Sequence, residues 1–343
     1  MTLTHPRTLS IAALSIFAVV LGPAAAHAED KKEEKKEEKR EAADEKKEAE
    51  REEAKEDEAE EPGFMVGIEA VTGFGKVEAL NLKPTTSFGS LSYERKQTSA
   101  LVVSPVASLS FPVTKHVRLG ALFPFVIGSL SPADDKSRGA ANWGNVELEA
   151  EYEREITKQV GFEFGLGVAL PTAVGDELPE QDTLDRLGVN TNTVSADKFS
   201  INHAAQFSRG GEVNALFEPK HLGIIPKITI PIHLSKVKVE PYVKTENLFS
   251  TVADSPHPIT VELVAGVRVA YAVTSWFDAG VRAWGNFTMT AHDGRDLNIG
   301  AVEPELRFHY HVVRATLGGV IPFAGEPSNP GFGGVRTGLL FSF

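Results

Sequence analysis

The 343-residue sequence contains no cysteine. Disulfide bonds therefore cannot stabilise its fold, and lipid anchoring through an N-terminal cysteine after export is excluded. Long apolar runs are also absent, because beyond residue 29 no stretch approaches the ~20 residues of a membrane-spanning helix. A basic surplus is lacking too, since 47 acidic residues outnumber 35 basic ones and the formal net charge is −12. Nucleic-acid binding, which needs a basic face, is therefore not expected.

The first 28 residues have the features of a secretory signal peptide. The first ten carry Arg7 and no acidic residue, and residues 9–22 are apolar throughout except for serine. This run is too short to cross a bilayer comfortably as a helix. Small residues follow at the spacing that signal peptidase recognises, ending at Ala28. We therefore predict that residues 1–28 are an export signal, cleaved near Ala28, and not a membrane anchor.

Residues 29–62 form a charged segment. Residues 29–61 hold 18 acidic and 10 basic side chains and no apolar residue larger than alanine. Like charges recur four positions apart and opposite charges three apart, so their effects on a lone helix partly cancel. A segment of this composition cannot bury a core. We predict a disordered or marginally helical periplasmic tether; the functional alternative is a dock for the cell wall or a periplasmic protein.

From residue 63 onward, apolar residues alternate with polar, charged or glycine residues. In 261–271, for example, Val267 lies on an apolar face while Glu262 and Arg268 fall on the opposite one. Such stretches exceed the ~5–6 residues of typical soluble strands and meet the ~9–11 that a tilted membrane strand needs. Twelve strands are predicted: 64–74, 99–112, 115–129, 143–155, 158–171, 221–234, 237–249, 259–272, 275–288, 299–310, 312–322 and 332–343.

The connections between these strands alternate in length. Tight turns are predicted at 113–115, 156–158, 235–236, 273–275 and 311, with longer loops between them. Short periplasmic turns and longer external loops are typical of outer-membrane barrels, whose closure leaves no unpaired edge in lipid. The sequence therefore predicts an all-β fold over 63–343. It is an antiparallel up-and-down transmembrane β-barrel of about twelve strands, surrounded by bacterial outer-membrane lipid.

Several prolines fall inside the predicted strands, where a proline removes a ladder hydrogen bond. They are Pro124, Pro226, Pro231, Pro241 and Pro304. We expect bulges or shifted register around residues 222–242, with 221–234 the least regular strand.

Two sets of residues resemble known proteins. The ending GLLFSF resembles the C-terminal signal of bacterial outer-membrane barrels, which implies that the barrel assembly machinery recognises Leu339, Phe341 and Phe343. Residues 143–172 and 271–283 resemble the outer-membrane family that includes meta-pathway phenol-degradation transporters, although Asn145 and Ala173 replace its expected Asp and Gly. The resemblance implies a transporter-like barrel, with hydrophobic or aromatic small molecules as one cargo.

The charged face of the strands is predicted to line the lumen. Its members are Glu69, Arg118, Glu147, Glu149, Glu151, Glu153, Glu163, Glu262, Arg268, Asp278, Arg282, Glu303, Glu305, Arg307, Arg314 and Arg336. Lys227, His233, Lys238, Glu240, Lys244, Glu246 and His309 share this face. One interpretation is a salt-bridged network that holds the wall and partly fills the bore, since isolated buried charges are costly. The other is a narrow channel in which the ladder Glu147–Glu153 favours cations.

The function expected from these features is passive passage of small solutes, either hydrophobic or aromatic compounds or small cations, through a polar lumen. The alternative is a structural barrel that anchors the charged segment. An enzyme is not expected, because no Ser/His/acid spacing stands out, and no catalytic, cofactor or metal site is assigned. The long loop 172–220 is the place where function would concentrate, and part of it could fold inward as a constriction.

Overall fold

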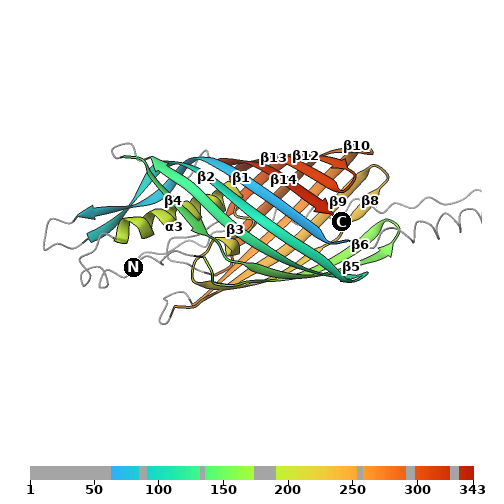
Figure 1. The fold of residues 1–343 in the computed structure, drawn as a ribbon, viewed down its shortest axis with the longest axis horizontal. Helices are drawn as coiled ribbons and strands as arrows, with labels where there is room; N and C mark the ends of the chain where they lie inside the picture. The colour runs from blue at the N-terminus through green and yellow to red at the C-terminus, as the bar shows by residue number, and fades with distance from the viewer. Residues whose placement is uncertain are drawn as a thin grey trace, which may run out of the picture. The chain divides into compact units, whose positions relative to one another are not determined.

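The computed structural model describes residues 63–84, 91–131, 136–173, 191–252, 258–290, 298–324 and 332–343. The export signal and tether predicted for 1–28 and 29–62 lie outside these residues. In the described part of the chain the strands form one closed antiparallel barrel (Figure 1). The prediction of an all-β, up-and-down barrel is confirmed.

Fourteen β segments build the barrel, namely β1 (Met65–Pro84), β2 (Leu91–Thr114), β3 (Val117–Ser131), β4 (Arg138–Trp143), β5 (Glu147–Thr157), β6 (Val160–Ala169), β7 (His221–Thr229), β8 (Ile232–Leu234), β9 (Val237–Ser250), β10 (Ile259–Thr274), β11 (Phe277–Thr288), β12 (Ile299–Tyr310), β13 (Val313–Ala324) and β14 (Gly333–Ser342). β4 and β5 both pair with β3, and β7 and β8 both pair with β9. The described segments therefore make twelve wall strands, as the sequence predicts.

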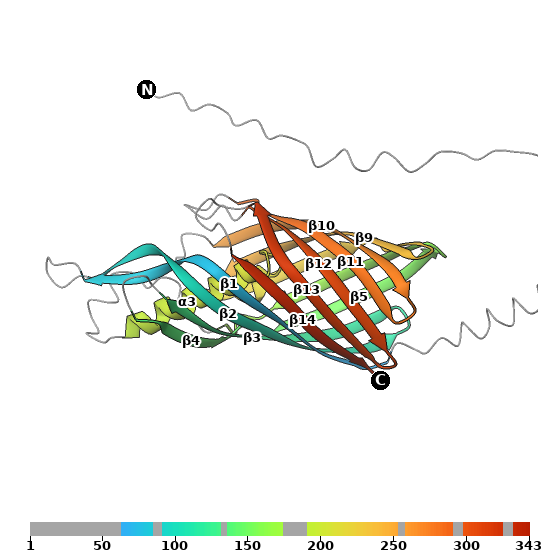
Figure 2. The same cartoon turned by 90° about the horizontal axis from the view of Figure 1, so that it is seen from above.

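The ring closes where the last strand pairs with the first, and β9 and β10 continue the wall across the loop that joins them. β14 pairs with β1 from Met65–Ser342 to Phe74–Gly333. The backbone N–H of Phe343 extends this ladder by donating to the carbonyl of Phe64 at 2.9 Å. β9 pairs with β10 over thirteen registered residue pairs. Figure 2 shows the strands running obliquely around the ring, as closure of a barrel requires.

All five tight turns of the described residues lie at one end of the barrel, which we call the turn end; the opposite end is the loop end. The turns fall at residues 115–116, 158–159, 235–236, 275–276 and 311–312. Three of them share one construction, in which a threonine precedes the turn and the strand register shifts at that residue. The hydroxyls of Thr114, Thr157 and Thr274 accept hydrogen bonds from the turn N–H groups. This local side-chain bond substitutes for the missing ladder bonds.

Two wall strands are interrupted. The predicted irregular strand 221–234 breaks at Ile230 and Pro231, between β7 and β8. A second break, at residues 144–146 between β4 and β5, was not predicted. The predicted ends of the first hairpin also need correction, since β1 continues past residue 74 to Pro84 and β2 begins at Leu91. Beyond Phe74, β1 pairs with β2 alone, so this extension has no barrel face to impose an apolar alternation.

The two faces of the wall differ in the way that the alternation predicts. On β10, Val267 is exposed on the outer surface, whereas Val264 and Arg268 are buried inside. The outer surface carries many large exposed apolar side chains, including Phe74, Ile127, Trp143, Leu166 and Phe287. The apolar groups are therefore displayed outward around the ring and the charged groups are collected within it.

The described part of the chain also contains helix α3 (Thr191–Ser208) and a short 3-10 turn η2 (Asn214–Leu216). Figure 1 shows α3 among the strands toward the loop end. No helix of the described residues is both long enough and apolar enough to span a membrane. Glycines in the wall allow α3 to approach closely. A Cβ on Gly73 of β1 would lie 2.3 Å from the Cβ of Ser208, and one on Gly334 of β14 would lie 2.5 Å from the Ser208 carbonyl oxygen.

This close approach predicts that Gly73→Val destabilises the folded barrel. The added side chain would collide with Ser208, Phe332 and Val102, and overpacking of this kind costs about 1–3 kcal/mol. The matched control is Gly319→Val on β13, where an added Cβ meets no atom within 4 Å. Thermal unfolding in detergent micelles measures both variants. Equal stability of the two variants would contradict the packing of α3 against the wall.

Candidate functional site

Residues 191–220, which we call the inner segment, fill much of the loop-end half of the barrel. Ile201, Ala204, Ala205, Phe207 and Phe217 are all buried. Ile201, Phe207, Leu216 and Phe217 form one apolar cluster with wall residues that include Val102, Val126 and Leu130. Over residues 200–208 the helix is buried around its circumference and not along one stripe, as expected for a helix enclosed by a wall. The inward folding that the sequence analysis considered for loop 172–220 is therefore observed in its described part.

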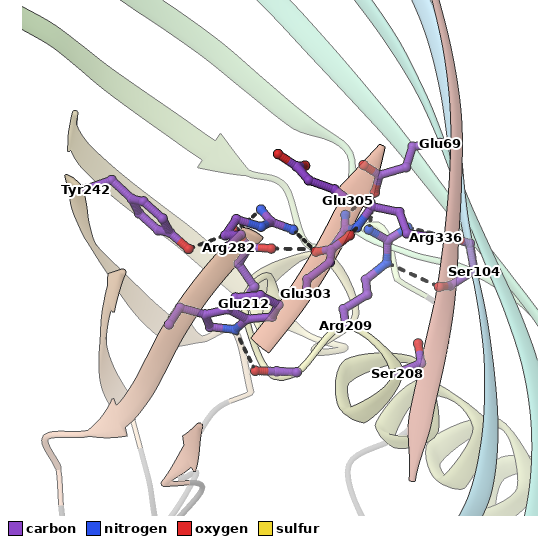
Figure 3. A network of polar contacts seen from close by, with 12 residues as sticks. Glu69, Ser104, Ser208, Arg209, Glu212, Tyr242, Arg282, Glu303, Glu305 and Arg336 are labelled. Carbon is purple, nitrogen blue, oxygen red and sulfur yellow. Dashed lines mark hydrogen bonds and ion pairs between the residues drawn. The ribbon is translucent and has the colours of Figure 1, made fainter. Parts of the chain in front are cut away.

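A ring of ion pairs joins the inner segment to four wall strands (Figure 3). We call it the ion-pair ring; its members are Glu69 on β1, Arg282 on β11, Glu303 on β12, Arg336 on β14, and Arg209 and Glu212 on the inner segment. Three carboxylates alternate with three guanidinium groups, so that each charge is balanced locally.

The distances within the ion-pair ring are those of charge-assisted hydrogen bonds. Glu69 Oε1 accepts from Arg209 Nη1 and from Arg336 Nη1, each at 2.6 Å. Glu303 accepts from Arg336 Nε at 2.8 Å and from Arg282 Nη2 at 2.5 Å. Arg282 Nη1 donates to Glu212 Oε1 at 2.6 Å, and this bond completes the connection back to the inner segment.

Further hydrogen bonds fix the two charged side chains of the inner segment. Arg209 donates from Nε to Ser104 Oγ at 3.2 Å and from Nη2 to the Ser104 carbonyl at 2.6 Å. The hydroxyl of Tyr242 donates to Glu212 Oε1 at 3.2 Å.

Burial alone would raise the pKa of Glu212, but the guanidinium groups of Arg282 and Arg336 outweigh the effect of burial and lower that pKa below its ordinary value. The carboxylate is therefore ionised at neutral pH, and its contribution to stability is lost only as the pH falls below the usual glutamate range.

A second group of contacts holds the turn that follows α3. Gly210 and Gly211 adopt left-handed backbone conformations, with φ of +63° and +67°, which end the helix and turn its carbonyls toward β11. Trp284 Nε1 donates to the Gly210 carbonyl at 3.0 Å, and Asn286 Nδ2 donates to the Gly211 carbonyl at 2.7 Å. The same Asn286 amide donates to the buried carboxylate of Glu262 at 2.7 Å.

The η2 turn is held by two wall carboxylates, Glu262 and Glu246. Asn214 Nδ2 donates to Glu262 Oε2 at 2.7 Å. The backbone N–H of Ala215 donates to Glu246 Oε2 at 2.8 Å, and Lys244 Nζ donates to the other oxygen of Glu246 at 2.7 Å. Glu262, Glu246 and Lys244 therefore have their partners in the inner segment or in one another.

The unpredicted break between β4 and β5 is a fourth attachment of the inner segment. Asn145 lies at the break and is fully buried. Its side-chain NH₂ group donates to the carbonyls of Ala215 and Glu218 at 2.8 and 2.6 Å, and its Oδ1 accepts from the N–H of Ala173 at 2.8 Å. An aspartate at this position would have no N–H to offer the two carbonyls. Asn145 and Ala173, the two positions that differ from the family pattern described for residues 143–172, therefore contact each other in the structure.

Most of the other residues proposed to line the lumen lie in two groups. Glu147, Glu149, Glu151, Glu153 and Glu163 occupy β5 and β6, where Glu147 is buried and Glu151 and Glu153 are exposed. Arg268, Asp278, Arg307 and Arg314 line a cavity of about 260 Å³ between β9 and β13. Glu305 joins this second group by pairing with Arg268 and Arg307.

Arg118 stands apart from both groups. It donates to Ser110 Oγ at 3.2 Å and to the Gly63 carbonyl at 3.1 Å. On β14, Leu339 is exposed on the outer surface and Phe341 is half-buried, and Phe343, which follows the strand, is exposed.

Sequence reasoning missed Arg209, Glu212 and Asn214 as members of the site. They follow one another in the stretch RGGEVN, which has neither strand alternation nor an apolar helical stripe. The adjacent pair of glycines was the only local signal, and it indicates a turn without indicating what the turn contacts.

The barrel fold is shared with proteins of known structure. Comparison of the sequence with protein families and with curated proteins gave no match. An outer membrane channel from Pseudomonas putida F1 aligns with a TM-score of 0.55 and 10% identity over 82% of this chain and 96% of that chain. The translocator domain of the autotransporter NalP from Neisseria meningitidis aligns at 0.42 and 9% identity, over 88% of this chain and 97% of its own. The monoaromatic hydrocarbon channel TodX aligns at 0.37 and 12% identity, over 82% and 90%. The first of these likenesses establishes the fold.

The geometry of the ion-pair ring predicts that Glu303→Gln strongly destabilises the barrel. Glu303 is fully buried between two guanidinium groups, and removal of one partner from a buried pair costs about 3–5 kcal/mol. Glu153→Gln is the control, because Glu153 is an exposed acid on β5 and a surface change typically stays within about 0.5 kcal/mol. Unfolding by guanidinium chloride in detergent measures both. A Glu303 variant as stable as the control would show that the ring does not hold the fold.

Proposed function

We propose that this chain is an outer-membrane channel for small solutes, in which the inner segment restricts passage. The observation that carries the proposal is the opposition of the two wall faces: exposed apolar side chains surround a closed ring whose interior is charged. An apolar outer belt suits lipid, while water-soluble charged groups inside suit an aqueous passage. The fold shared with a Pseudomonas putida outer membrane channel supports this function.

The lumen chemistry favours water-soluble solutes. Arginine and glutamate side chains occupy the inner face at both ends of the described barrel, and the cavity at the turn end is lined by basic groups. A hydrocarbon that passes along such a wall would displace water from the charged groups and offer them no hydrogen bonds in return. Aromatic compounds, which the family resemblance implies, are therefore the weaker candidate cargo. Small cations gain support from the acidic ladder of β5.

A structural role remains the second candidate, and a specific observation favours it. The inner segment buries most of its side chains against the loop-end wall, which suits a barrel that is filled and not open. On this alternative the barrel would serve to hold the charged segment 29–62 near a periplasmic partner or the cell wall.

Conductance across a planar bilayer distinguishes the two functions. We expect the full chain to give small current steps, and the double variant Arg209→Gln/Glu212→Gln to give larger or more frequent ones, because it removes both inner-segment charges from the ion-pair ring. Lys198→Gln, a change elsewhere on α3, should behave as the parent. Silence of the parent and of the double variant, with both correctly folded, would refute the channel and leave the structural role.

If the barrel is embedded in a membrane, an arginine on the outer face of β10 should impair its assembly. Val267→Arg places a charge near the middle of this strand and should cost about 2–4 kcal/mol if lipid surrounds it. Ala272→Arg is the control, since it lies on the same strand and lines the turn-end cavity. Heat-modifiable mobility in outer-membrane fractions measures assembly. Equal assembly of the two variants would contradict a lipid-facing surface at Val267.

The same assay tests the proposed assembly signal Leu339, Phe341 and Phe343. If the barrel assembly machinery recognises these side chains, Phe343→Ala should lower the assembled fraction although Phe343 is exposed and packs little. Unchanged assembly would remove that partner from the proposal.

A further inference from the structure

The turn-end cavity has a distinctive charge. It occupies about 260 Å³ among the strands β8 to β13, and five basic side chains contribute to its lining. They are Lys236, Lys238, Arg268, Arg307 and Arg314. Asp278 is the acidic residue of the lining, and His233 and His309 are its imidazoles.

The acidic groups around the cavity balance only part of this charge. Glu240 accepts from Arg268 and, at 2.9 Å, from Lys238. Glu305 accepts from Arg268 and, at 3.2 Å, from Arg307 Nη2. Asp278 contacts His309 Nε2 at 2.8 Å. Five basic groups therefore face three carboxylates, and each of those carboxylates already has a partner.

One donor of the cavity is buried without an acceptor, and two further basic groups are open to solvent. The Nε of Arg307 is buried without a hydrogen-bond partner, whereas the side chains of Arg314 and Lys236 are exposed and, within the described residues, form no ion pair or side-chain hydrogen bond. A buried unsatisfied donor normally costs free energy, so its presence indicates a group that the site is built to receive. Two guanidinium groups and an ammonium aimed at one cavity match the oxygens of a carboxylate or phosphate.

The acidic residues elsewhere on the wall add to the preference of this cavity for anions. β5, with Glu149, Glu151 and Glu153, lies six wall strands from β12 in either direction around the ring. The acids of β5 are therefore separated around the ring from Arg307 and Arg314 on β12 and β13, whereas Glu163 of β6 lies near Lys238 at the other edge of the cavity. An anion is repelled from the acidic wall and drawn to the basic one, as long as the separation is not screened by salt.

We propose that the turn-end cavity is a binding site for a small oxyanion, a carboxylate or a phosphate, with Arg307 and Arg314 as its anion-contacting residues. The volume suits a small ion with some of its water, since one water occupies about 30 Å³ of liquid. Val237, Ala270 and Ala272 give the site an apolar side that can contact a short carbon chain. Binding itself is independent of the channel, whereas a role of the site in selecting the solute rests on the proposed function.

Calorimetric titration of the full chain, folded in an uncharged detergent at low salt, tests the site with two probes, inorganic phosphate and succinate. We expect saturable binding of at least one, and the probe that binds identifies the source of the oxyanion. Arg307→Gln/Arg314→Gln should weaken binding about tenfold or more, because it removes both guanidinium groups that donate charge-assisted hydrogen bonds to the oxyanion. Arg154→Gln, which removes an exposed arginine of β5 outside the cavity, should leave the affinity unchanged.

A second variant, Arg314→Lys, keeps the charge and guards against loss of folding in the double variant. It should bind more weakly than the parent and more tightly than Arg314→Gln. Absence of saturable binding to either probe, or equal weakening by Arg154→Gln, would overturn the site. Oxyanion binding by a barrel that conducts no current would uphold the site and refute the channel. Conductance without oxyanion binding would uphold the channel and refute the site.

Discussion

The structure depends on the burial of the Glu303 carboxylate between Arg282 and Arg336. This group has no access to water, and its charge is tolerable because two guanidinium groups hold its two oxygens. Arg282 and Arg336 in turn reach Glu212 and Glu69, so one buried carboxylate links the wall to the inner segment. A closed barrel must have its interior either filled or wet. Here the ion-pair ring fixes which part is filled.

The barrel itself could be predicted because its information is local. A strand between an apolar exterior and a charged interior must alternate with period two, and that alternation is visible within ten residues of sequence. Val267 and Arg268 are placed on opposite faces by it, as the structure confirms. The turns were equally accessible, since a threonine hydroxyl next to each of three turns bonds only to the next few residues.

The interior could not be predicted, because its contacts join residues far apart in the chain. Arg209 meets Glu69 across 140 residues, and no period or spacing connects them. The alternation places Val264 on the inner face, but it does not show that this side chain is completely buried with Trp284, Ala301 and Val320 and not facing water. Alternation identifies the inner face, but whether water or protein occupies that face depends on the loops.

The two halves of the lumen use charge differently, and this difference follows from where the inner segment ends. Toward the loop end, Arg209, Glu212 and Asn214 bring partners to the wall, so that Glu69, Glu262 and Glu303 are all satisfied by protein groups. Toward the turn end no described residue of the inner segment lines the cavity, and the wall charges must find partners among themselves. They do so incompletely. The acidic and basic side chains that stabilise the fold are thus the compensated ones, and the uncompensated basic groups are where the chemistry of a solute can be selected.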